Sequence, residues 1–215
     1  MATQRVHLVR HGEVENPNGL LYERLPGFSL SERGHRMARL AAEDLRERDI
    51  QATKLIVSPL ERTQQSAASI AELLGLDSEL DERVIEPWNA FAGKTMHGRY
   101  SALRRPMSWR HLVNPTKPSW GEPYREIVER MKAAILDATA AAEGGDVIVV
   151  THQLPIWMVH RRLRGVPLVH NPKHRRCALS SITTLEYHPA TGLVEVDYRE
   201  PAAAELAGAI DEGAV

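Results

Sequence analysis

Apolar residues recur along this chain at two spacings, which predict strands alternating with helices. Short apolar runs typical of β-strands cover residues 3–9, 54–57, 78–84, 146–150, 180–187 and 193–198. The run at 146–150 is apolar at four successive positions, as in a central strand that is covered on both faces. The last two runs flank a turn-forming stretch at 188–192 and predict a hairpin at the edge of the sheet.

Apolar residues at helical spacing predict four helices between these strands. They are expected from about 31 to 45, 59 to 74, 122 to 142 and 154 to 163. The first helix begins with Ser29, in capping-box spacing with Glu32, or with Ser31 as its N-cap. Ser58-Pro59 supplies a cap and a first-turn residue for the second helix. This alternation predicts a three-layer α/β/α sandwich with a mixed, mostly parallel central sheet.

The stretch from 87 to 120 breaks the periodicity. It holds three of the four tryptophans and several basic residues, among them Arg104 and Arg105. A long irregular segment inside a compact domain is typical of a lid or a substrate-binding loop, although a short helix with a solvated basic face also fits. We expect one domain over residues 1–200, with 87–120 as a substrate-selecting insertion and 201–215 as a mobile tail.

Composition narrows the classes of protein. The 215 residues carry 27 Lys and Arg against 28 Asp and Glu, a net charge of −1, so no excess positive charge favours a nucleic-acid partner. A basic run at 161–176 lacks interleaved aromatic residues and is expected to be a solvated rim. A single cysteine, Cys177, fits a reducing compartment. With no signal peptide and no membrane-length apolar run, we expect a cytoplasmic protein, and a homodimer stays open.

Charged and imidazole side chains follow the predicted strands at their carboxyl ends. Arg10-His11-Gly12 comes after the first strand, Arg62 lies in the first helical turn after the second, and His152 follows the strand at 146–150. Glu86 comes after the third strand. Taken singly, each is equally compatible with an ordinary surface charge. Because the carboxyl ends of parallel strands share one edge, together they predict a site for an anion.

In this order the motifs resemble the histidine phosphatase (phosphoglycerate mutase-like) superfamily, over roughly residues 4–188. The matching pieces are Leu8-Val9-Arg10-His11-Gly12-Glu13, Ser58-Pro59-Leu60-Glu61-Arg62-Thr63, Glu86 and Val150-Thr151-His152. Glu82 is an alternative to Glu86. We prefer Glu86 because it precedes a glycine-ended segment, 89–93, like the one that follows the acid of the family.

The resemblance implies a phosphohistidine on His11, phosphate binding by Arg10, His11, Arg62 and His152, and a general acid at Glu86. Two guanidinium groups can each bind phosphate oxygens with a rigid fork, and their charge keeps a neighbouring imidazole neutral for attack. The resemblance also implies that no metal ion takes part. Neither a His-Glu-x-x-His nor an Asp-x-Asp motif occurs in the sequence.

Departures from the family pattern affect the expected substrate contacts. The Trp-Asn pair of many members is replaced by Val14-Glu15-Asn16-Pro17-Asn18, so Asn16 and Asn18 are both candidates for substrate binding, as are Arg104 and Arg105. We expect a phosphatase that acts on a small phosphorylated metabolite without a cofactor. The alternatives are a phosphoglycerate mutase, which would use 2,3-bisphosphoglycerate, and a phospholigand-binding module without turnover.

Overall fold

A six-stranded mixed sheet forms the middle layer of the molecule. The computed structural model describes residues 4–95, 120–209 and 211. Its strands are β1 (Gln4–Arg10), β2 (Ala52–Val57), β3 (Ser78–Leu80), β4 (Asp146–Thr151), β5 (Ile182–His188) and β6 (Gly192–Arg199). They lie in the order β3-β2-β4-β1-β5-β6. The first four strands in this order are parallel, whereas β5 and β6 form the predicted antiparallel edge hairpin.

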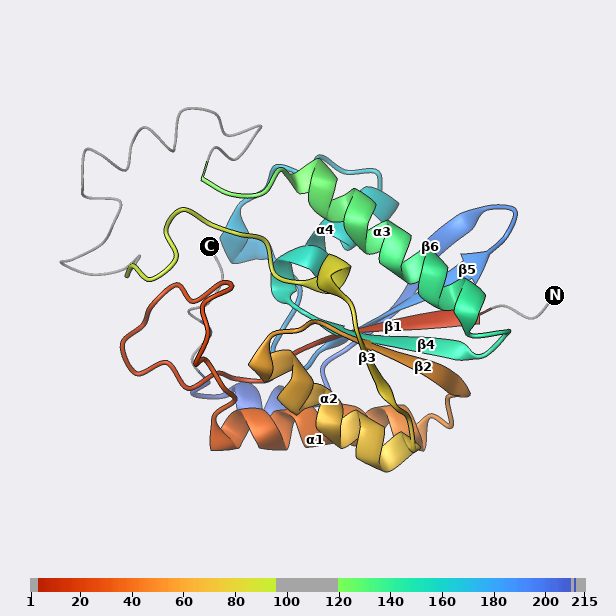
Figure 1. Ribbon diagram of the computed structural model, residues 1–215, viewed down its shortest axis with the longest axis horizontal. Helices are drawn as coiled ribbons and strands as arrows, with labels where there is room; N and C mark the ends of the chain where they lie inside the picture. Colours follow the sequence, from red (N-terminus) through yellow and green to blue (C-terminus); the bar gives the residue numbers. More distant parts are fainter. Residues whose placement is uncertain (1–3, 96–119, 210, 212–215) are drawn as a thin grey trace.

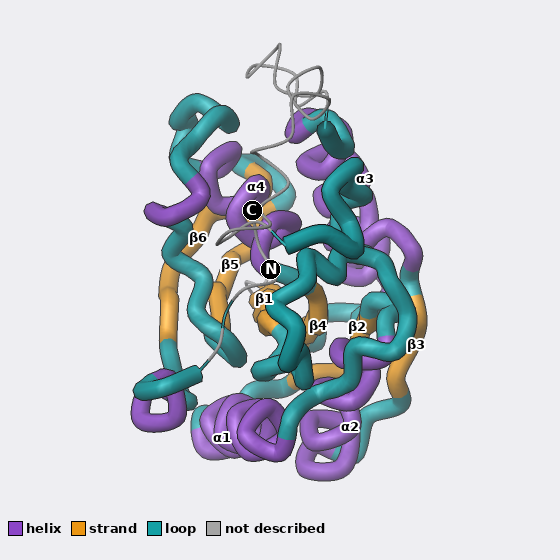
Figure 2. The backbone as a smooth tube through the Cα atoms, turned by 90° about the vertical axis from the view of Figure 1, so that its left-hand side faces the viewer, coloured by secondary structure: helices purple, strands orange, loops and turns teal. Residues whose placement is uncertain are grey.

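Two pairs of helices cover the two faces of the sheet (Figures 1 and 2). One pair is α1 (Glu32–Glu47) and α2 (Glu61–Leu74), and the other is α3 (Tyr124–Ala141) and α4 (Gln153–Leu163). The predicted three-layer α/β/α sandwich is therefore confirmed. No helix in the described ranges is long and apolar enough to cross a membrane.

Strand β4 is apolar on both faces because it lies between both helical layers. Val147 and Val149 pack with residues of α3 and α4, whereas Ile148 and Val150 pack with residues of α1 and α2. All four side chains are at most 1% exposed. Complete burial of one such side chain contributes roughly 1.5–3 kcal/mol. Strand β4 therefore stabilises the apolar cores on both faces of the sheet.

The strand predicted over residues 78–84 is wrong beyond Leu80. Strand β3 ends there, and Glu82–Val84 form one turn of 3₁₀ helix. Asp81 caps this turn, since its Oδ1 accepts a hydrogen bond from the backbone nitrogen of Arg83 at 2.7 Å. The polar cap turns the chain out of the edge of the sheet before a longer strand can form.

The predicted helix caps divide into one that forms and one that does not. The second candidate serine, Ser31, is the N-cap of α1, and its Oγ accepts from the backbone nitrogen of Gly34 at 3.0 Å. The expectation that Ser58 caps α2 is wrong, because Leu60 occupies the N-cap position without a side-chain hydrogen bond. The buried Ser58 hydroxyl instead hydrogen-bonds His152.

The two ends of the predicted insertion lie side by side. Asn89 forms an antiparallel bridge with Gly121, and the backbone nitrogen of Ala90 donates to the carbonyl of Trp120 at 2.6 Å. The two arginines expected to select the substrate lie outside the described residues. The insertion therefore begins and ends at one place.

Two glycines allow the loop after β1 to pack directly on the start of α1. A Cβ atom on Gly12 would lie 2.3 Å from the carbonyl oxygen of Gly34, and one on Gly34 would lie 2.0 Å from that of Glu13. Both distances are far below van der Waals contact, so a side chain at either position would push the loop away. This contact fixes the segment that carries His11.

Replacing Gly34 with alanine is expected to lower the free energy of unfolding by about 1–3 kcal/mol, the cost of overpacking. A decrease is informative, because replacing glycine with alanine inside a helix otherwise raises the free energy of unfolding by up to about 1 kcal/mol. Urea denaturation followed by circular dichroism measures it. The control is His35→Ala, at the exposed next position. A Gly34→Ala protein as stable as the wild type would contradict the backbone contact.

Candidate active site

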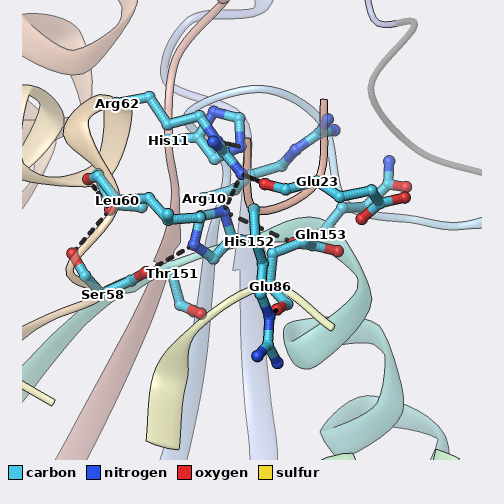
Figure 3. A network of polar contacts seen from close by, with 12 residues as sticks. Arg10, His11, Glu23, Ser58, Leu60, Arg62, Glu86, Thr151, His152 and Gln153 are labelled. Carbon is cyan, nitrogen blue, oxygen red and sulfur yellow. Dashed lines mark hydrogen bonds and ion pairs between the residues drawn. The ribbon is translucent and has the colours of Figure 1, made fainter. Parts of the chain in front are cut away.

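Three adjacent parallel strands bring the candidate residues to one edge of the sheet. Arg10 is the last residue of β1 and is paired in register with Thr151, the last residue of β4. His11 and His152 follow directly. Arg62 lies in the first turn of α2, just after β2. Figure 3 shows the four predicted phosphate-binding side chains gathered in one network.

The His11 imidazole is buried and held in one tautomer. Its Nδ1 lies 2.8 Å from the carbonyl oxygen of Gly12, and because a carbonyl can only accept, Nδ1 carries the proton. Its Nε2 accepts a hydrogen bond from Nε of Arg62 at 3.3 Å. Burial, and then the charges of Arg62 and Arg10, hold the pKa of His11 well below its usual value. His11 is therefore a neutral imidazole with its lone pair on Nε2.

Arg62 is the centre of the network and is 1% exposed. Its Nη2 donates to the carbonyl oxygen of Glu23 at 2.6 Å and to Nδ1 of His152 at 3.3 Å. The guanidinium carbon also lies 4.8 Å from the centre of the Tyr22 ring. Burial lowers the pKa of Arg62, but a guanidinium keeps its proton in any protein environment. A fixed positive charge therefore touches both histidines.

His152 is oriented by Arg62 on one side and by Ser58 on the other. Since Arg62 can only donate, Nδ1 of His152 accepts, and Nε2 carries the proton that it donates to Oγ of Ser58 at 2.7 Å. Burial, and then the charge of Arg62, lower the pKa of His152 well below its usual value. Its ring centre lies 5.2 Å from that of His11. Both histidines are thus neutral and face each other.

Glu86 is the carboxyl group that reaches this pair. Its Oε2 lies 3.5 Å from Nδ1 of His152, and the residue is 7% exposed. Burial raises the pKa of Glu86 to about 7, although the charge of Arg62 opposes the shift. Glu82, the alternative acid, is exposed at the start of the 3₁₀ turn. Geometry therefore favours Glu86.

Two side chains hold the backbone that presents Glu86. Oγ1 of Thr151, at the end of β4, donates to the carbonyl of Val84 at 2.5 Å. Nε of Arg24 donates to the carbonyl of Glu86 itself at 2.5 Å. Hydrogen bonds to a charged donor contribute roughly 1.5–3 kcal/mol each. The acid is thus positioned by the strand that also delivers His152.

Two groups beside Glu86 were not singled out in the sequence as site residues. The Glu23 carboxyl, 5% exposed, accepts a hydrogen bond from Nδ2 of Asn89 at 3.3 Å, and burial and the charge of Glu86 raise its pKa well above the usual value. Arg175 donates to Oε1 of Gln153 at 3.2 Å. With Glu86 they line a small pocket, so Arg175 belongs to the candidate site and not only to a solvated rim.

Arg10 is held by partners from the C-terminal quarter of the chain. Its Nη1 donates to the carbonyl of Cys177 at 2.6 Å and to the Asp211 carboxylate at 2.8 Å, and its Nη2 donates to the same carboxylate. Among the described residues, Nε of Arg10 has no hydrogen-bond partner. Asp211, which lies in the predicted tail, thus contacts a predicted phosphate-binding residue.

Of the other residues predicted to bind substrate, the structure describes Asn16 and Asn18. The Asn16 side chain hydrogen-bonds both backbone groups of Leu20 within its own loop, at 2.8 and 3.0 Å. Asn18 is exposed in a turn. Their role in substrate binding stays a prediction, as does that of Arg104 and Arg105. Over the part of the chain that the structure describes, no group of three or more potential metal ligands is assembled.

Comparison with known proteins gives consistent matches. The sequence model of the histidine phosphatase superfamily (branch 1) matches residues 6–197. The uncharacterized protein Rv0525 of Mycobacterium tuberculosis H37Rv is 47% identical over 199 residues, which are 93% of this chain and 97% of that protein. The probable phosphoglycerate mutase GpmB of Enterobacter sp. strain 638 is 30% identical over 193 residues, 88% of this chain and 87% of that one.

A solved structure has the same fold. The native structure of the mycobacterial glucosyl-3-phosphoglycerate phosphatase Rv2419c superposes with a TM-score of 0.71 at 24% identity, covering 92% of this chain and 96% of that one. The superfamily match spans most of the chain, including both histidines and both arginines of the site. The chain belongs to the histidine phosphatase superfamily.

Proposed function

We propose that this protein is a phosphatase that hydrolyses a small phosphomonoester through a phosphohistidine on His11. The observation that carries the proposal is the state of the His11 ring, which is neutral, fixed through Nδ1 by Gly12 and directs Nε2 at a buried guanidinium. Membership of the superfamily supports phosphoryl transfer. We also propose that the reaction needs no metal ion, since the two arginines supply the positive charge that a metal would otherwise contribute.

Substrate binding exchanges hydrogen bonds at the nucleophile. The phosphate dianion draws Nε of Arg62 to one of its oxygens, which releases the lone pair on Nε2 of His11. Nδ1 of His152 accepts a hydrogen bond from Arg62, so it binds a phosphate oxygen only after gaining a proton, which the entering negative charge favours. Charge-assisted hydrogen bonds of this kind contribute roughly 1.5–3 kcal/mol each.

In the transfer step, Nε2 of His11 forms a bond to phosphorus while the bond from phosphorus to the ester oxygen breaks. Glu86, with a pKa of about 7, gives its proton to the departing oxygen. The products are the free alcohol, phosphorylated His11 and an ionised Glu86. The arginines stabilise the charge on the transferring group throughout.

Hydrolysis reverses the role of Glu86. A water molecule enters the pocket beside Glu86, and the carboxylate takes one of its protons as the oxygen attacks phosphorus. The bond from phosphorus to Nε2 breaks, which returns His11 to its neutral form. Glu86 is again protonated and ready for the next substrate.

The similarity to GpmB supports a second function, transfer between positions of phosphoglycerate with 2,3-bisphosphoglycerate as cofactor. Such a substrate carries further negative charge next to its phosphate. In the described lining of the pocket beside Glu86, Arg175 is the one guanidinium, and the carboxylate of Glu122 is already paired with Arg24 and Arg130. Nζ of Lys94, another cation that could bind the second anionic group, lies 5.5 Å from the ring centre of Phe91. A single guanidinium in the described lining favours hydrolysis of a less anionic ester.

Wild-type protein mixed with a ³²P-labelled phosphomonoester in the presence of EDTA should carry acid-labile label on His11 after denaturation. His11→Ala should carry none, because Nδ1 of His152, the other imidazole of the network, gains a proton as phosphate enters and can then only donate a hydrogen bond. The exposed His35→Ala is the matched control and should label normally. Full labelling of His11→Ala would refute the nucleophile, and a need for added metal would refute metal independence.

Glu86→Gln should slow hydrolysis of alkyl phosphates by about 10²–10³-fold, the usual contribution of a general acid, and slow aryl phosphates much less. Aryl alcohols leave without full protonation. Because the protonated carboxyl group is the active form, wild-type activity on alkyl phosphates should fall as pH rises through about 7. Steady-state kinetics across pH measures both. The control is Glu82→Gln; if it shows the loss and Glu86→Gln does not, Glu82 is the acid.

Hydrolysis and transfer are separated by supplying 3-phosphoglycerate with catalytic 2,3-bisphosphoglycerate. We expect little 2-phosphoglycerate, since the described pocket lining offers a second anionic group one guanidinium, that of Arg175. We also expect release of inorganic phosphate from other monoesters. Enzymatic assays of 2-phosphoglycerate and of phosphate follow the two outcomes. Rapid isomer formation with negligible phosphate release would establish a mutase instead.

A further inference from the structure

The C-terminal segment delivers a carboxylate to Arg10. Oδ2 of Asp211 accepts from Nη1 at 2.8 Å and Oδ1 accepts from Nη2, so one carboxylate engages both terminal nitrogens of the guanidinium. The Arg10 side chain is 2% exposed and that of Asp211 is 36% exposed. Asp211 therefore approaches a buried arginine from the side that is open to solvent.

Contacts along the segment bring Asp211 to this place. Ala202 is buried in a small cluster with Met37 of α1. Further on, Nη1 of Arg33 donates to the carbonyl of Gly208 at 2.5 Å. The segment thus runs across the start of α1, which also supports the loop that carries the nucleophile.

The carboxylate has the chemistry of a phosphate edge. Two neighbouring oxygens can accept from two N–H groups of a guanidinium, whether they belong to a carboxylate or to a phosphate. Burial raises the pKa of Asp211, but the charge and hydrogen bonds of Arg10 lower it by more, so Asp211 is ionised at neutral pH. Without an anion, the buried Arg10 charge would be left uncompensated, which is strongly destabilising.

We propose that Asp211 is a built-in competitor for phosphate: its carboxylate holds the two donors of Arg10 that a phosphate group takes during turnover, and Asp211 must withdraw before substrate binds fully. The inference rests on the phosphate-binding role of Arg10 in the proposed function. Competition of this kind multiplies the affinity for phosphate by the fraction of molecules in which Asp211 is withdrawn, so it raises the apparent Kd.

If Asp211 instead helps phosphate to bind, its removal changes the phosphate affinity in the opposite direction. If Asp211 stays in place and only orients Arg10, so that Nε meets the phosphate, then removing the carboxylate would weaken phosphate binding. The two roles are therefore separated by a measurement of affinity, which needs no turnover.

The test is calorimetric titration of the full chain with inorganic phosphate. Asp211→Asn should bind phosphate more tightly than the wild type, by about tenfold if the carboxylate occupies Arg10 in nine molecules of ten. Asp211→Glu, which keeps the charge, should stay closer to the wild type. The control is Glu205→Gln, which removes another acid of the same segment that pairs with Arg36 outside the site and should leave the phosphate affinity unchanged.

Thermal melting supplies a second measurement. In phosphate-free buffer Asp211→Asn should melt at a lower temperature than the wild type, because Arg10 has lost its anion, and phosphate should raise its melting temperature by more. Weaker or unchanged phosphate binding by Asp211→Asn would overturn the proposal. Tighter binding by a protein that hydrolyses no ester would support it while refuting the phosphatase, and ester hydrolysis with no gain in phosphate affinity would do the reverse.

Discussion

The site depends on two guanidinium groups that are buried beside two imidazoles. Arg10 and Arg62 are each 1% exposed, so solvent screens their charge little. Burial and this positive charge keep His11 and His152 neutral, and a neutral imidazole is what the proposed nucleophile, His11, requires. The same field opposes the raised pKa of Glu86, where desolvation is the larger effect. In the proposed function, the two negative charges of an entering phosphate offset this field, so phosphate binding favours a protonated His152 and a protonated Glu86.

This arrangement is accurate only because of the sheet that supports it. β2, β4 and β1 are parallel neighbours, so their carboxyl ends place a helix start and two histidines within hydrogen-bond reach of one another. Thr151 extends this frame, since it ends β4 and also holds the carbonyl of Val84 just before the acid. The Gly12 and Gly34 contact then fixes the nucleophile loop on α1. The histidines and Arg62 therefore take their positions from backbone elements, whereas Glu86 also depends on the side chains of Thr151 and Arg24.

The sequence predicts those site residues that directly follow a recognisable strand. Arg10, His11 and His152 lie at the ends of strands whose apolar runs are visible, and the structure brings them together with Arg62. Ser58 was misassigned because a serine before a proline is an equally good helix cap, and only the fold reveals that its hydroxyl meets His152. The strand predicted at 78–84 failed for a similar local reason, the cap that Asp81 forms.

Glu23, Arg175 and Asp211 have no sequence signal, since each reaches the site from a segment whose local pattern indicates only a turn, a basic run or a tail. Asp211 lies 201 positions from its partner, Arg10. Asp211 supplies the negative charge that compensates the buried cation of Arg10. In the proposed competition, a phosphomonoester brings two negative charges where Asp211 brings one, and it also contacts Arg62 and both histidines. Charge and number of contacts are therefore the two reasons why the proposal lets substrate displace Asp211, and the proposal restricts the protonated forms of His152 and Glu86 to molecules that hold phosphate.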